Sequence, residues 1–519
     1  MKKPFLLFAA LLSFTSSYCQ SSAEYFNSSL RKYENKNYSD ALVDVDKSLA
    51  ANPNNADAYN LRGMAYYRLN KFALALNDFN KTLELNPSFA GNYYFRGTCK
   101  MRLNDYLGAF ADYDMQVKLN PQDAVNYNNR GNIRASMDDY QGAIADFNRA
   151  IELKPEYATP YSSRGLAEFR LNMFSQALKD LDKAIGLSAS LDEAYLTRAR
   201  TKFRLNDTAG ACTDIKSYKD LTHPGNTAAP AECRDWLISD SYYWASREKE
   251  RKQQFKEEIV LLNKAISLTP DQVELYGARG AAEVLLEDYQ KAIADFSIAI
   301  ALDPNSWLAY AHRGVAKAKL SNYADAVKDY SQSLSLNPFD PETWYNRGVS
   351  RFYLEFYSSA LSDFDKCIQL DPQNVNGWLF RGYTKGRMDN YKDAISDFDK
   401  ALQLNPTSAE GYGNRGLSKL MLSDWNGALQ DLDRSIALDS TAVMPHNVRA
   451  QAKAKLEDFK GALVDLDFVL RIQPDHLQAL HNRIAVKANL GDKAGACADY
   501  RKALKLGEQP DSELEEYCK

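Results

Sequence analysis

The sequence predicts an all-α fold, an α-solenoid (right-handed superhelix) of about fourteen helix-turn-helix units in two arrays. Three observations predict this fold. An arginine recurs every 34 residues, other residue types keep the same phase, and apolar residues within each unit recur at helical spacing. A fold without internal repeats has no reason to keep one period over most of its length.

The arginine series defines the period, and we call the residues at one position of successive units a column. Its members lie 34 residues apart in two runs, Arg62, Arg96, Arg130, Arg164 and Arg198, then Arg279, Arg313, Arg347, Arg381, Arg415, Arg449 and Arg483. Tyrosine precedes most of these arginines by three residues, as at Tyr59. Alanine recurs from Ala41 to Ala496, and proline closes most units from Pro53 to Pro474.

Each unit contains two apolar stretches whose spacings of three and four residues are those of amphipathic helices. Turn residues such as Asp138-Asp139 separate the two stretches, and proline separates one unit from the next. We expect Gly63 and Ala75 where the two helices cross, because a larger side chain would push their backbones apart. One helix pair cannot cover its own apolar face, so stacking of neighbouring pairs must stabilise the array.

These columns resemble the tetratricopeptide repeat family. One unit matches that family's pattern at Tyr59, Gly63, Tyr66, Ala75, Phe79 and Pro87. The resemblance covers nearly all of the chain after residue 19. It implies stacked helix pairs whose first helices line an inner surface, where members of the family bind their ligands. It says much less about which ligand is bound.

The phase of the columns predicts three regions, a signal peptide over residues 1–19, a first array over 20–235 and a second array over 236–519. The first array holds six units and the second holds eight. The first unit of the second array is degenerate, with Ala245 in the arginine column and Glu258 in the alanine column. Degenerate units are typical of the end of a solenoid.

The cysteines near the two array ends predict a pair of disulfides. Cys212 is followed by Cys233 and Cys497 by Cys518, each 21 residues on, within similar local sequences. Equal spacing at both ends indicates that a terminal segment is pinned over the last helix pair. Free thiols or a metal site are the alternatives. Cys99 and Cys367 stand in columns of small residues, so we expect core packing for both.

Aspartate recurs in the second helix of nearly every unit, from Asp44 to Asp499. The unit that has Ala245 in place of arginine also has Leu261 in place of aspartate, which indicates that the two residues pair. We therefore interpret the two columns as structural ion pairs rather than as catalytic groups.

The first nineteen residues have the order of an export signal. Lys2 and Lys3 precede an apolar run, and Ser17 and Cys19 are small where a peptidase would need them. Cleavage before Gln20 lowers the net charge from −4 to −6. The alternative is a lipoprotein signal with acylated Cys19. Either way we expect an exported chain that is periplasmic, outer-membrane-associated or extracellular.

Composition argues against several classes of function. The formal net charge of −4 does not favour nucleic-acid binding, which needs a surplus of basic residues on one face. The chain has 5 histidines without zinc-site spacing, and neither a phosphate-binding loop nor a nucleophile elbow occurs. We expect no cofactor, no metal and no catalysis.

Candidate contacts for a protein or peptide partner lie in the first helix of each unit, on a stripe at positions −2, +2, +5 and +6 from each arginine of the 34-residue series. In the first array the stripe holds Asn60, Tyr67, Arg68, Tyr94, Arg102, Asn128, Asn132, Phe169, Arg170, Phe203 and Arg204. In the second array it holds Tyr345, Phe352, Tyr353, Tyr383 and Arg387 among further apolar residues. The first set suits an extended acidic peptide. The second set is more apolar and aromatic, which indicates a partner or self-association. The alternatives are a solvated helix face in the first array and burial by the chain's own coil in the second.

Together these features predict a non-catalytic protein-binding scaffold or adaptor. One alternative is an outer-membrane-anchored lipoprotein that organises envelope protein assembly through lipidated Cys19. Another is an enzyme whose site is grafted onto the solenoid.

Overall fold

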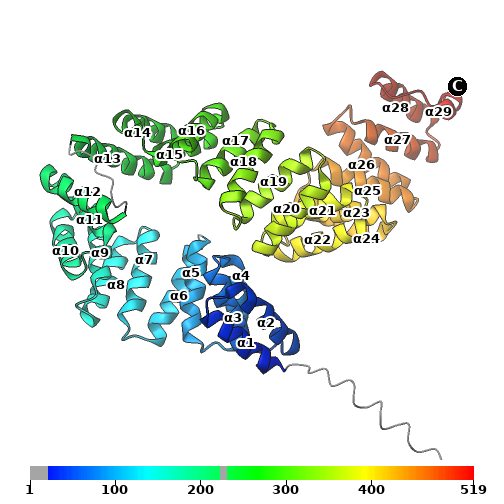
Figure 1. The fold of residues 1–519 in the computed structure, drawn as a ribbon. Coiled ribbons are helices and arrows are strands. Elements are labelled where there is room, and N and C mark those ends of the chain that lie inside the picture. The colour runs from blue at the N-terminus through cyan, green and yellow to red at the C-terminus, as the bar shows by residue number, and fades with distance from the viewer. Residues whose placement is uncertain (1–20, 104, 223–230) are drawn as a thin grey trace, which may run out of the picture. The chain divides into compact units, whose positions relative to one another are not determined.

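The computed structural model describes residues 21–103, 105–222 and 231–519, in which it contains 29 helices and no strand (Figure 1). The predicted signal peptide, residues 1–19, lies outside the described residues. Within the described ranges, no helix is both long and apolar enough to cross a membrane. The predicted all-α repeat fold is confirmed, with fourteen consecutive helix pairs followed by one short helix.

The chain divides into two compact units, the first ending at Pro304 and the second beginning at Asn305. The first unit contains α1 (Ser22–Glu34), α2 (Tyr38–Ala51), α3 (Ala56–Arg68), α4 (Phe72–Leu85), α5 (Ala90–Arg102), α6 (Tyr106–Leu119), α7 (Ala124–Ser136), α8 (Tyr140–Leu153), α9 (Ala158–Arg170), α10 (Phe174–Leu187), α11 (Asp192–Arg204), α12 (Thr208–Thr222), α13 (Ala231–Arg251), α14 (Phe255–Leu268), α15 (Val273–Leu285) and α16 (Tyr289–Leu302).

The second unit contains α17 (Trp307–Lys319), α18 (Tyr323–Leu336), α19 (Pro341–Tyr353), α20 (Tyr357–Leu370), α21 (Val375–Arg387), α22 (Tyr391–Leu404), α23 (Ala409–Met421), α24 (Trp425–Leu438), α25 (Val443–Lys455), α26 (Phe459–Ile472), α27 (Leu477–Asn489), α28 (Lys493–Lys505) and α29 (Ser512–Tyr517). Within each unit, the two helices of a pair pack together, and the second helix also packs against the first helix of the next pair.

Local sequence sets where the helices begin and end. Asp139 caps α8, because its Oδ1 accepts a hydrogen bond from the Gly142 backbone N–H at 2.9 Å, and Asp424 caps α24 in the same way. The residue before the cap has a left-handed backbone, with φ of 62° at Asp138 and 79° at Gly491. This conformation closes the tight turn between the two helices of a pair.

The core follows the alanine, glycine and aromatic columns. Alanines of the column that runs from Ala41 to Ala496 are fully buried, together with the rings of Phe147 and Phe364. A Cβ added to Gly131 would lie 2.7 Å from Cε1 of Phe147, which is closer than packed atoms tolerate. The prediction that small residues mark the helix crossing is therefore confirmed.

The predicted pairing of arginine with aspartate is confirmed, and we call these pairs the ladder. Arg130 is typical, because its Nε and Nη2 donate to the two carboxylate oxygens of Asp146 at 3.0 and 2.6 Å. Its Nη1 reaches back to Asp114 on the preceding pair at 2.6 Å, so one guanidinium group connects two neighbouring units. The guanidinium also lies over the ring of Tyr127, with 5.6 Å between the carbon and the ring centroid.

Most ladder aspartates accept a second cation, which the sequence analysis did not identify. The residue four positions after the ladder arginine supplies it, as Lys202 does for Asp214 at 2.9 Å and Arg134 does for Asp146 at 2.8 Å. Glu168 and Glu283 occupy this column in their units, so there a carboxyl group replaces the second cation.

Both predicted cysteine pairs form disulfides, with sulfur atoms 2.06 Å apart in Cys212–Cys233 and 2.01 Å apart in Cys497–Cys518. The first connects α12 to α13 and the second connects α28 to the end of α29. Cys99 and Cys367 are buried free thiols, as expected for core residues, and burial raises the pKa of each to about 12.

Helix α13 connects the two predicted arrays. Cys233 and Leu237 pack with α11 and α12, whereas Tyr242 and Tyr243 pack with Leu262 of α14. The array boundary that we predict at residue 235 therefore falls inside one continuous helix, which covers the end of one array and begins the next.

Candidate functional site

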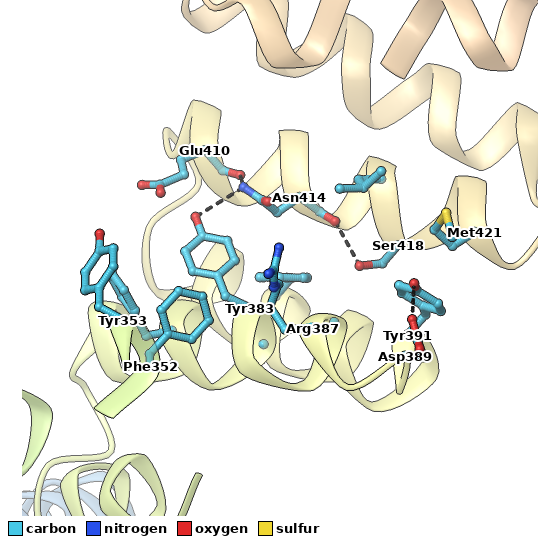
Figure 2. A pocket seen from close by; sticks show the side chains of 15 residues that line it. Phe352, Tyr353, Tyr383, Arg387, Asp389, Tyr391, Glu410, Asn414, Ser418 and Met421 are labelled. Carbon is cyan, nitrogen blue, oxygen red and sulfur yellow. Dashed lines mark hydrogen bonds between the residues drawn. The ribbon is translucent and has the colours of Figure 1, made fainter. Parts of the chain in front are cut away.

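The second unit contains a pocket of about 580 Å³ on three successive first helices, α19, α21 and α23 (Figure 2). It is lined by Phe352, Tyr353, Phe380, Gly382, Tyr383, Gly386, Arg387, Asp389, Tyr391, Phe398, Glu410, Asn414, Leu417, Ser418 and Met421. First helices of successive pairs lie side by side in a stack of this kind, so residues far apart in sequence meet at one surface.

Aromatic rings form one wall of this pocket. Phe380 lies between Phe352 and Tyr383, with ring centroids 6.1 and 5.4 Å apart and edge-to-face geometry in both pairs. Tyr353 and Met421 remain exposed at 54% and 51% of their surface. The pocket therefore combines an ordered aromatic wall with large apolar side chains that water still contacts.

Polar groups from α23 line the opposite side of the pocket. Asn414 donates from Nδ2 to the hydroxyl oxygen of Tyr383 at 3.1 Å and to the backbone carbonyl of Glu410 at 2.8 Å (Figure 2). Burial, followed by the nearby Glu410 carboxylate, raises the pKa of Tyr383 above its ordinary value. The phenol therefore stays protonated and can donate a hydrogen bond at neutral pH.

Charged groups also line the pocket, with Arg387 between Glu410 and Asp389 (Figure 2). Arg387 is exposed, and its Nε donates to the hydroxyl oxygen of Tyr357 at 3.4 Å, which raises the pKa of the guanidinium. Asp389 accepts a hydrogen bond from the Tyr391 hydroxyl at 2.6 Å. The pocket thus offers an apolar surface beside fixed hydrogen-bond donors and acceptors.

Four of the five predicted contacts in the second array line this pocket, namely Phe352, Tyr353, Tyr383 and Arg387. Tyr345 does not line it, because its ring is half-buried between Phe364 and Phe380, with centroids 6.2 and 5.5 Å away. The predicted stripe of four repeat positions does not include Glu410, Asn414 and Ser418, which line the pocket from other positions of the repeat.

The predicted contacts in the first array lie in different surroundings. Arg68 and Arg102 are exposed, Tyr94 is partly exposed, and Asn60 and Tyr67 are half-buried. Asn132 and Arg170 line a cavity of about 330 Å³. Phe169, Arg170, Phe203 and Arg204 line another of about 260 Å³, whose wall is completed by α13 together with Asn172 and Arg200.

The prediction of Asn128 as an accessible contact is wrong. This side chain is only 3% exposed, and its Oδ1 has no hydrogen-bond partner among the described residues. Tyr94 occupies the same column and is 36% exposed, so the position in the repeat does not by itself decide whether a side chain is accessible. In residues 21–103, 105–222 and 231–519, no group of three or more histidine, cysteine, aspartate or glutamate side chains could hold a metal ion.

Family models match the chain in both units. Models of the tetratricopeptide repeat match residues 56–89, 278–341, 312–375 and 375–408, and a TPR repeat model matches residues 131–172. Among curated proteins, no relative matches this sequence.

Several solved structures are similar. A tetratricopeptide repeat protein from Parabacteroides merdae is 18% identical, with 47% of this chain and 97% of that chain covered and a TM-score of 0.39. Yeast Tom70 is 19% identical, with 83% and 94% covered and a TM-score of 0.33. YrrB, a TPR protein described as having an unusual peptide-binding site, is 22% identical, with 36% and 96% covered and a TM-score of 0.32.

The 34-residue period, the stacked helix pairs and the repeated family matches agree with one another. The chain belongs to the tetratricopeptide repeat family.

Proposed function

We propose that this chain is a non-catalytic scaffold or adaptor that binds an extended segment of a protein partner in the pocket of the second unit. Membership of the tetratricopeptide repeat family indicates a protein-interaction scaffold in general terms. The observation that supports this pocket in particular is its combination of exposed Tyr353 and Met421 with the ordered polar groups of Tyr383 and Asn414.

The pocket chemistry suits an extended peptide with one large apolar side chain. That side chain would be buried against Phe352, Phe380 and Leu417, where removing apolar surface from water stabilises the complex. An extended backbone leaves its own N–H and C=O groups unpaired. The hydroxyl of Tyr383 and the side chains of α23 can pair with them.

A random peptide library displayed on phage tests this proposal. The library is selected on the full chain, and recovered peptides are then measured against the double variant Tyr353→Ser and Met421→Ser. Both side chains are more than half exposed, so the variant should keep its fold. A matched control is Val464→Ser on α26, because Val464 is an exposed apolar residue at 68% and lies outside the pocket.

We expect recovered peptides to share an aromatic or large aliphatic residue and to bind the double variant at least about tenfold more weakly. A tenfold loss corresponds to about 1.4 kcal/mol, within the range of burying part of one large side chain. The control should bind as the unchanged chain does. Peptides that bind the double variant undiminished would place the peptide site elsewhere.

We also propose that the chain functions outside the cytoplasm. The two disulfides, Cys212–Cys233 and Cys497–Cys518, support this, because structural disulfides persist in oxidising compartments. Mass spectrometry of the mature N-terminus tests the proposal and its alternative. Free or cyclised Gln20 indicates cleavage of the signal, diacylglyceryl Cys19 indicates a membrane-anchored form, and an intact Met1 in the native protein contradicts export.

A further inference from the structure

Helix α13 lies against α9 and α11, which are first helices of the first array, and lines a cavity there. Asp240 on α13 accepts hydrogen bonds from Nε and Nη2 of Arg200 at 2.8 and 2.7 Å. Trp244 lies next to Arg170 of α9, with 3.9 Å from the guanidinium carbon to the ring centroid. Between these contacts the cavity measures about 260 Å³ and has Phe169 and Phe203 in its walls.

The cavity has more positive than negative charge available to a ligand. Its lining includes Arg170, Arg200, Arg204, Asp240 and Glu248. Arg200 and Asp240 pair with each other, and Glu248 pairs with Lys252 at 2.7 Å. Arg170 and Arg204 have no carboxylate within 4.0 Å among the residues that the structure describes. Two guanidinium groups are therefore left without an anion.

Arg170 differs from the ladder arginines in having no carboxylate partner among the described residues and a lowered pKa. Arg198 of the ladder pairs with Asp214, and this pairing raises the pKa of its guanidinium above the ordinary value. Burial lowers the pKa of Arg170, and the charges of Arg251 and Arg200 act in the same direction. A half-buried cation near other cations is stabilised when an anion binds beside it.

The contacts with aromatic rings leave the N–H groups of both guanidinium groups available to hydrogen-bond a ligand. The guanidinium carbon of Arg170 lies 3.9 Å from the Trp244 ring centroid, and that of Arg204 lies 5.0 Å from the Phe174 ring centroid. A guanidinium that contacts an aromatic face keeps its N–H groups in its own plane, where they can grip a carboxylate with two parallel hydrogen bonds. Phe169 and Phe203 provide apolar surface for the stem of such a ligand.

We infer that this cavity is a carboxylate-binding site, in which Arg170 and Arg204 hold an acidic side chain of a bound polypeptide against the wall formed by Trp244 of α13. The inference does not depend on the pocket of the second unit. It assigns a binding role to α13. The repeat pattern does not predict that this helix lines a binding surface.

The test measures binding of a defined peptide to the full chain by fluorescence anisotropy. The probe is fluorescein-Gly-Ser-Ala-Leu-Glu-Ala-Leu-Ser-Gly-amide, and its matched partner has glutamine in place of glutamate. A third peptide has glutamine and a free C-terminal carboxylate. The proteins are the unchanged chain, Arg170→Gln, Arg204→Gln, the double variant and the control Arg31→Gln. Arg31 is exposed on α1 in the same unit, lies outside the cavity and is not one of the predicted partner contacts.

We expect the unchanged chain to bind the glutamate peptide about tenfold more tightly than the glutamine amide, because a carboxylate paired with arginine forms charge-assisted hydrogen bonds. The double variant should reduce this ratio to less than about twofold, and Arg31→Gln should leave it unchanged. Arg204 is exposed, so Arg204→Gln alone should lower the ratio in a folded protein. Circular dichroism checks the fold of each variant.

Two results would overturn the inference. One is equal binding of the glutamate and glutamine amides by the unchanged chain, and the other is an equal loss in Arg31→Gln and in the double variant. Preference for the free C-terminal acid over both amides would show that the site takes a chain end, and would contradict the assignment to a side chain.

Discussion

Glu168 is a buried carboxyl group in a column where most units have a lysine or arginine, and its replacement by glutamine should stabilise the protein above neutral pH. The side chain is 8% exposed, and Oε2 has no hydrogen-bond partner among the described residues. Burial, followed by the Asp180 carboxylate, raises the pKa of Glu168 from 4.5 to about 7, although Arg164 opposes the change. The folded protein therefore favours the neutral acid.

The direction of the pH dependence follows from this raised pKa. The unfolded chain releases the proton near pH 4.5, whereas the folded chain keeps it until about pH 7. The contribution of Glu168 to stability is therefore fully present below pH 4.5 and is lost as the pH rises through 7. A glutamine keeps the neutral form at every pH, so the benefit of the substitution should grow over the same range.

The size of the effect follows from the interval between the two pKa values. Converted at about 1.36 kcal/mol per pH unit, that interval gives an upper value of about 3.4 kcal/mol. A charge buried near a protein surface draws in water and relaxes its surroundings, so we expect about 1–2 kcal/mol at pH 8. Near pH 4.5, Glu168→Gln should differ from the unchanged chain by less than about 0.5 kcal/mol.

Hydrogen exchange of α9 and α10 at pH 5 and pH 8 is the suitable assay, because a repeat array can open in parts and a global transition would average over them. Rates are corrected for the intrinsic pH dependence of exchange. Glu156→Gln is the control, since Glu156 is exposed in the loop before α9. The reasoning is refuted if Glu168→Gln protects these helices equally at both pH values, or exposes them at pH 8.

Further predictions concern the ladder, the helix crossings and the terminal disulfide. Asp146→Asn should destabilise its helix pair by about 3 kcal/mol, because it removes the buried carboxylate that pairs with both Arg130 and Arg134, and a loss below about 0.5 kcal/mol in urea unfolding would contradict the ladder's role. Gly131→Ala should lower the stability by about 1–3 kcal/mol, because the added Cβ would lie too close to the ring of Phe147. Gly91→Ala should change the stability by no more than about 1 kcal/mol, because no atom lies within 4 Å of the Cβ it would add. Equal melting temperatures of the two variants would refute this contrast. Cys518→Ser should release α29 and increase hydrogen exchange there, and unchanged exchange would show that packing alone holds the helix.

The repeat and its internal pairing were predictable because each depends on residues at fixed separation within a unit. Arg130 and Asp146 lie 16 residues apart, on facing helices of one pair, so their columns carry the same phase. Gly131 likewise faces Phe147 within one pair, where a larger side chain would not fit. Cys212 and Cys497 could be assigned because the two array ends repeat the same local sequence.

The candidate sites were predictable only in part, because accessibility depends on neighbouring pairs. Tyr94 and Asn128 occupy one column, yet the first is 36% exposed and the second only 3%. Glu410 lines the second-unit pocket from a position outside the four that were considered. Trp244 belongs to the degenerate unit, and no column indicates that it lies against Arg170.

By itself, the sequence determined the helix pairs, their number, the crossing glycines and the ion pairs, since short-range geometry repeated in phase encodes all of these. Only the tertiary structure decided which inner side chains face a cavity and where α13 packs. Those outcomes depend on how each helix pair packs against the next and on contacts between residues far apart in sequence, such as Arg200 and Asp240, which no repeat period records.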